Sequence, residues 1–190
     1  MRLLPLLLAA ITLTGCVEFL DHRLPEVADS LVRSKVESVD YSLVVRWEGV
    51  LAPEQVGIYS IILETPMHHL FTKVQRGGTS APLNLHFVLS TPTIAPGEYA
   101  YWNLAALTAF VIPLRREILY QLDVQASWNG SPFRNYHYED SKVLWVELLL
   151  LPVWPFGPSP TKTQLDIIRN MELTFLIDLS KDLEALDVSH

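Results

Sequence analysis

Histidine is the residue type in this sequence best suited to metal binding or acid–base chemistry. His68 and His69 are adjacent, His86 lies in a stretch of alternating apolar and polar residues, and His137 stands between two tyrosines. Adjacent side chains of an extended segment point to opposite sides, so His68 and His69 do not chelate one ion unless the chain bends there. We therefore expect surface histidines and no metal site.

Nucleophilic and phosphate chemistry find little support in the sequence. It contains no Gly-x-Ser-x-Gly elbow, and Gly77-Gly78 lacks the lysine and the spacing of a phosphate-binding loop. The carboxylate pair Glu139-Asp140 lies in a run that is also typical of a strand with one face in water. We expect a protein that is not an enzyme and that carries no cofactor.

Cys16 is the only cysteine, which excludes an intramolecular disulfide and a thiolate metal cluster. It follows Arg2 and an apolar run, residues 3–13, that is too short for a bilayer span of about 20 residues. Residues 1–16 resemble a bacterial lipoprotein signal peptide, and Leu13-Thr14-Gly15-Cys16 fits the lipobox at all four positions. The alternatives are a plain secretory signal, or a buried N-terminal strand with a chance cysteine.

The resemblance implies cleavage between Gly15 and Cys16, a diacylglyceryl group on the Cys16 sulfur, and an acyl chain such as palmitate on the new amino terminus. Several acyl chains anchor stably, because each buried methylene contributes about 0.8 kcal/mol and one chain alone binds marginally. Val17 rather than Asp at the next position implies the outer membrane under the enterobacterial sorting rule. We expect a lipid-anchored protein on the periplasmic face of that membrane.

The charge of the chain supports lipid as the means of attachment. Its net charge is −7, and removal of residues 1–15 takes away Arg2 and leaves 13 positive against 21 negative residues, a net of −8. So acidic a chain has no broad attraction for anionic headgroups. The same balance argues against nucleic acid, which is bound by clustered Lys and Arg.

Alternating apolar and polar residues predict strands at 42–48, 57–64 and 83–89. Their polar faces favour antiparallel pairing, because strands of a parallel sheet covered on both sides are apolar throughout. The clearest hairpin joins residues 117–128 to residues 133–145 through Asn129-Gly130. Opposed residue numbers then add to about 260. The predicted pairs include Val124 with Tyr136, Leu122 with Tyr138, and Leu114 with Val146.

The C-terminal part predicts a long amphipathic helix. Thr161 and Gln164 fit a capping box, and apolar residues follow at helical spacing from Leu165 to Leu186. We expect an α+β fold, with an antiparallel sheet or sandwich of five to seven strands and this helix packed on or beside it. The expected divisions are a signal peptide, 1–15; a lipidated tether or short helix, 16–38; a β-rich domain, 39–158; and the helix of the same domain, 159–190.

Two apolar segments, residues 103–113 and 143–156, meet at the open end of the predicted hairpin. Neither is a convincing membrane span, since the first is too short and the second contains Glu147 and two prolines. Residues 148–156 are typical of a buried strand with a proline-rich crossover, or of an exposed ridge. If the ridge is exposed, the candidate membrane or partner contacts are Leu107, Phe110, Leu150, Trp154 and Phe156.

Residues 100–180 resemble small proteobacterial envelope lipoproteins of uncharacterised function, which have an apolar segment like residues 107–113 before a hairpin and a Leu/Pro-rich run like residues 148–156. The resemblance implies no catalytic residue. Two functions remain open. One is an interaction or accessory module that binds another envelope protein. The other is a carrier or sensor of an apolar ligand, which needs a cavity of about 300 Å³ or more between the sheet and the C-terminal helix.

Overall fold

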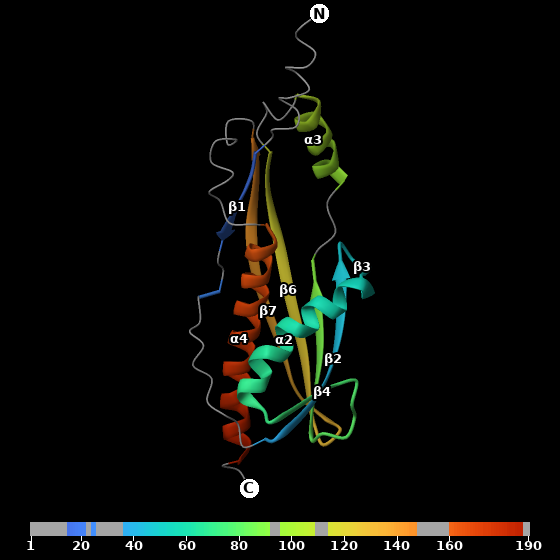
Figure 1. Ribbon diagram of the computed structural model, residues 1–190, viewed down its shortest axis with the longest axis vertical. Helices are drawn as coiled ribbons and strands as arrows, with labels where there is room; N and C mark the ends of the chain where they lie inside the picture. Colours follow the sequence, from blue (N-terminus) through green and yellow to red (C-terminus); the bar gives the residue numbers. More distant parts are fainter. Residues whose placement is uncertain are drawn as a thin grey trace, which may run out of the picture.

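The computed structural model describes residues 15–21, 24–25, 36–91, 96–108, 114–147 and 160–187 (Figure 1). In these residues seven strands form one sheet, in the order β1-β7-β6-β5-β2-β3 with β4 also paired to β2. The elements are β1 (Gly15–Asp21), β2 (Ser38–Trp47), β3 (Val50–Leu51), η1 (Pro53–Gln55), α2 (Val56–Leu70), β4 (Lys73–Arg76), β5 (Leu83–Ser90), α3 (Pro96–Leu107), β6 (Leu114–Trp128), β7 (Ser131–Glu147) and α4 (Pro160–Asp187). The predicted α+β class with a C-terminal helix is confirmed.

The hairpin of β6 and β7 is the longest pairing of the sheet. Asn129 and Gly130 form its turn with φ of 49° and 79°, a conformation that asparagine and glycine tolerate better than other residues. A register shift between Ala126 and Ser127 lies next to the turn. Beyond it the predicted pairs Val124–Tyr136, Leu122–Tyr138 and Leu114–Val146 are all present.

The sheet is mixed rather than wholly antiparallel as expected. β2 pairs in parallel with both β5 and β4, while the other pairings are antiparallel. Parallel neighbours cannot be joined by a tight turn and need a crossover connection. The segment between β2 and β5, which contains α2, provides that crossover.

Residues 57–64, predicted as a strand, are instead part of α2. The buried residues of α2 recur at helical spacing, and they are Tyr59, Ser60, Leu63, Pro66, Met67 and Leu70. Three isoleucines favour a strand locally, but as a helix the segment places Tyr59, Leu63, Met67 and Leu70 in the core. Tertiary packing therefore overrides the local preference.

Helices α2 and α4 lie on one face of the sheet, so the protein has two layers (Figure 1). Phe175 of α4 is fully buried, with its ring centre 5.4 Å from that of Phe87 and 5.2 Å from that of Tyr136. Helix α4 begins at Pro160, so Thr161 lies inside the first turn rather than at the cap. The Gln164 amide donates to the Tyr59 hydroxyl and joins the two helices.

The first residues expected in the tether form a strand instead. Gly15–Asp21 is β1, which pairs with β7 in the register Cys16–Val146, Val17–Trp145 and Phe19–Val143. Val17 and Phe19 are apolar residues at alternate positions, a pattern that favours a strand over a solvated linker. Residues 22–23 and 26–35 lie outside the described residues, so the short helix allowed within residues 16–38 stays a prediction.

Candidate functional site

Cys16 lies at one end of the elongated sheet. Its backbone pairs with that of Val146 on β7, and Val146 pairs in turn with Leu114 on β6, so these three residues form a row across the sheet. The row lies at the start of β6 and the end of β7, away from the Asn129-Gly130 turn (Figure 1). The predicted cleavage site, Gly15–Cys16, is therefore the first peptide bond of an edge strand.

Helix α3 packs on this same end. Ala105 is fully buried in a small apolar cluster with Leu114 and Val146, and Trp102 and Leu144 pack against that cluster half-buried. This cluster is separate from the larger core under α2 and α4. Cys16 and α3 are thus positioned by the same row of the sheet.

The outer side of α3 is exposed and mainly apolar, with Asn103 as an exposed polar residue on it. Tyr101 is 40% exposed, Leu104 49% and Leu107 85%. No charged residue occurs between positions 99 and 108. A solvent-facing helical surface without charge is unusual for a soluble protein, whose outer helical faces are normally charged or polar.

Of the predicted contact residues, Leu107 lies at the end of α3 on this exposed surface. Phe110, Leu150, Trp154 and Phe156 lie outside the described residues. Leu104 belongs to the apolar segment 103–113 noted in the sequence, whereas Tyr101 lies outside it and was missed. The signal that could have found Tyr101 is the three-residue spacing of Tyr101, Leu104 and Leu107, which places them on one side of a helix.

A scan of protein-family models and a search of curated proteins find no match for this chain. Within the described residues, no helix has the length and hydropathy needed to cross a bilayer.

Four of the histidines, His68, His69, His86 and His137, belong to the described residues and lie apart from this end of the sheet. His68 and His69 are exposed in the last turn of α2, and His86 Nδ1 lies 2.7 Å from Ser42 Oγ. His137 lies between two carboxylates, with Nδ1 2.7 Å from Asp123 Oδ1 and Nε2 3.3 Å from Glu139 Oε1. The described residues hold no group of three or more His, Cys, Asp and Glu placed to bind a metal ion.

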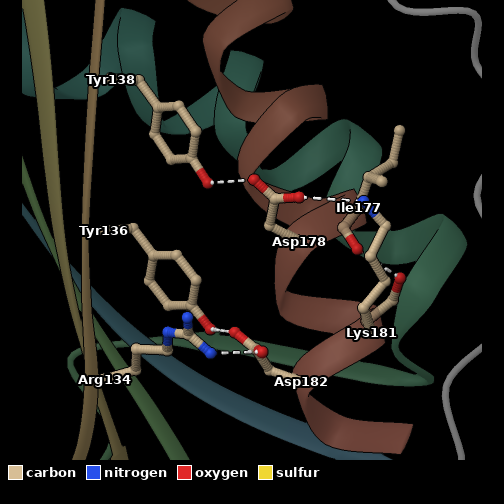
Figure 2. Close-up of polar contacts among 8 residues, drawn as sticks. Arg134, Tyr136, Tyr138, Ile177, Asp178, Lys181 and Asp182 are labelled. Carbon is tan, nitrogen blue, oxygen red and sulfur yellow. Dashed lines mark hydrogen bonds and ion pairs between the residues drawn. The ribbon is translucent and has the colours of Figure 1, made fainter.

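The side chains of β7 that face α4 form a polar interface (Figure 2). The Tyr136 hydroxyl donates to Asp182 at 2.7 Å, and the Tyr138 hydroxyl donates to Asp178 at 2.9 Å. Arg134 also binds Asp182, at 2.5 Å. Burial, followed by these hydrogen bonds, raises the pKa of both phenols above its ordinary value. Both hydroxyls therefore stay protonated at neutral pH and act as structural donors.

Charged groups continue along the same face of β7. Asp140 and Lys142 lie on the same face of β7 as Tyr136 and Tyr138, and both are almost wholly buried. The sequence had allowed Glu139 and Asp140 to be a pair in contact with water. The Lys142 ammonium lies 5.9 Å from the centre of the Tyr120 ring. Only Glu139 of that pair lies on the open face, so the two carboxylates do not converge on one substrate.

One spacing typical of a catalytic serine spans the beginning of α4. Ser159 and Lys162 have the Ser-x-x-Lys spacing found in some acyl-transfer enzymes. Ser159 lies outside the described residues, and Lys162 is exposed. The spacing alone does not define a site.

Proposed function

We propose that the protein is an envelope lipoprotein, anchored through Cys16 to the periplasmic face of the outer membrane, and that it acts as a non-catalytic interaction or accessory module. The observation that carries the anchor is the position of the lipobox cysteine, which opens an edge strand at one end of the sheet. A lipid attached at the start of this edge strand can extend from the end of the domain without passing over its other elements. Lipid on this residue would hold the domain by its end.

A strand at residues 15–21 and a lipobox are compatible. Cleavage before Cys16 removes only the first residue of β1, and the remaining residues keep their pairing with β7. The mature protein would then have no linker between lipid and sheet. Its domain would lie directly at the membrane surface.

Exposed apolar residues on β3 and α2 support a role in binding another envelope protein. They are Val50, Leu51, Ile58 and Ile61, and each is at least 60% exposed. They lie on an edge strand and on the first two turns of the helix that follows it. Apolar groups gathered in this way are typical of protein contact surfaces.

The alternative, a carrier of an apolar ligand, requires space between the sheet and α4. The centre of that layer is occupied by Phe175, whose ring makes edge contacts with Phe87, Tyr136 and Tyr138. These contacts occupy the middle of the layer in which the ligand was expected. The packing favours the interaction module.

Mass spectrometry of the full chain, produced in a Gram-negative host, tests the anchor. We expect a mature protein that begins at Cys16 and carries the added mass of its acyl chains. Cys16→Ser should remain uncleaved and unlipidated, whereas Val17→Asp should stay lipidated and move to the inner membrane. An unmodified Cys16 in an uncleaved wild-type chain contradicts the proposal.

Photo-crosslinking in the native envelope tests the interaction role. A photoreactive residue replaces Ile61 in one variant and Gln125, which is exposed on the open face of the sheet, in the control. We expect one discrete crosslinked protein from position 61 and none from position 125. Absence of any crosslink from position 61 argues against a partner at α2.

A further inference from the structure

We infer that α3 is a second membrane contact, whose outer side lies in the headgroup region of the bilayer beside the lipidated Cys16. This inference rests on the proposed anchor and adds to it a fixed orientation. The exposed side of α3 then contacts lipid and not another protein.

The position of α3 follows from the sheet register. Cys16 pairs with Val146, and Val146 and Leu114 hold Ala105 of α3. A membrane that receives the acyl chains of Cys16 therefore lies beside the end of the domain that carries α3. The anchored residue and the exposed helix belong to one continuous end.

The chemistry of the outer side suits the headgroup region. Leu104 and Leu107 are exposed apolar side chains, and Tyr101 adds an aromatic ring with a polar hydroxyl. Residues of this kind are enriched where apolar chains meet water. Because positions 99 to 108 have no charge, lowering this part of the helix into lipid desolvates no ionised side chain.

The direction of the strands then sets the orientation of the domain. β6 and β7 extend between the row that contains Cys16 and the turn at Asn129 and Gly130. This turn lies at the far end of the sheet (Figure 1). With two contacts at one end, the hairpin points away from the bilayer. The exposed residues Ile58 and Ile61 of α2 face the periplasm.

The single cysteine makes a direct test possible. Acylated Cys16 has no free thiol, so a cysteine placed elsewhere is the only position that takes a maleimide label. Lipidated Leu107→Cys carries an environment-sensitive fluorophore in phosphatidylcholine vesicles free of other protein. Ile61→Cys is the matched control, because Ile61 is also an exposed apolar helical residue, at 67%. Ser131→Cys reports the far end of the hairpin.

We expect the label at position 107 to shift its emission to the blue on reconstitution, and to lose intensity when the lipids carry bromine near the headgroup end of their chains. Labels at positions 61 and 131 should show neither change. A label at position 107 that behaves like the one at position 61 overturns the contact while leaving the anchor intact.

Failure of the anchor gives a different result. Wild-type protein then takes up one maleimide at Cys16 and does not float with the vesicles. That outcome overturns the proposed function together with the contact that rests on it. Wild-type protein that takes up no maleimide and floats with the vesicles supports the anchor. The label at position 107 then decides whether α3 contacts the membrane.

Discussion

The Tyr138 hydroxyl donates a hydrogen bond of 2.9 Å to the carboxylate of Asp178, and so joins the long strand β7 to the C-terminal helix α4. One helical turn further along, Tyr136 and Asp182 repeat the arrangement. Successive inward residues of a strand and successive turns of a helix advance by similar distances, about 6.8 Å and 5.4 Å, which lets two such pairs form side by side. The two polar pairs therefore fix the position of α4 along the length of β7.

Removal of the Tyr138 hydroxyl should destabilise the protein. Tyr138→Phe deletes one hydrogen bond to a charged group, which contributes about 1.5–3 kcal/mol, and leaves Asp178 with Lys181 at 3.1 Å. Urea unfolding followed by circular dichroism measures the change. Asn135→Ala, on the opposite and exposed face of β7, is the control and should change the free energy of unfolding by less than about 0.5 kcal/mol. Equal midpoints for the two variants would contradict the prediction.

The same tyrosines predict a loss of stability in alkali. Burial and the hydrogen bonds to Asp182 and Asp178 raise the pKa of Tyr136 and Tyr138 in the folded state, whereas tyrosines of the unfolded chain ionise near pH 10. Their stabilising contribution is fully present below about pH 10 and is lost as the pH rises from there towards the folded pKa values. The free energy of unfolding should therefore fall more steeply above about pH 10 in wild type than in Tyr136→Phe/Tyr138→Phe. Parallel pH profiles would show that these phenols do not cause the loss.

His137 should titrate above the ordinary histidine range. The hydrogen bond to Asp123 is the largest cause that raises its pKa, Glu139 acts in the same direction, and burial opposes them. Its contribution to stability is fully present below about pH 6.5 and is lost as the pH rises through the raised pKa. In NMR titrations we expect Asp123→Asn to lower the pKa of His137, while His86→Gln, which removes a histidine paired with Ser42, leaves it unchanged. An unchanged His137 pKa in Asp123→Asn would refute the assignment.

Gly78 should not tolerate alanine. A Cβ at this position would contact the side chain of Asp40, which is 2% exposed and whose Oδ2 accepts the N–H groups of Ser80 and Ala81 at 2.7 and 2.8 Å. Displacement of this carboxylate weakens both hydrogen bonds, so Gly78→Ala should cost about 2 kcal/mol of unfolding free energy. Gly57→Ala is the control, because a Cβ there meets nothing within 4 Å and the position is helical. It should stabilise the protein by up to about 1 kcal/mol, and a similar effect at Gly78 would disprove the contact.

The parts of the fold that depend on neighbouring residues could be predicted from the sequence. The register of β6 and β7 follows from Asn129-Gly130 and from strict alternation, because a short turn fixes which residues face one another. The buried stripe of α4 follows from helical spacing in the same way. In both cases one segment contains all the information.

The parts that depend on distant segments could not be predicted. Residues 57–64 form a helix because the parallel pairing of β2 with β5 requires a crossover, and nothing in that segment reports the pairing. Similarly, residues 15–21 form a strand because β7 offers a free edge. The candidate site is of this second kind, since Cys16 and α3 come together only through the sheet.

The pairing of β1 with β7 also sets an order for folding. The two strands are more than 100 residues apart in the sequence, so β1 cannot join the sheet until β7 (Ser131–Glu147) is available, and such distant pairings form slowly. Until then the backbone of residues 15–21 is without its β7 partner. The lipidation proposed for Cys16 would therefore precede the pairing of β1 with β7.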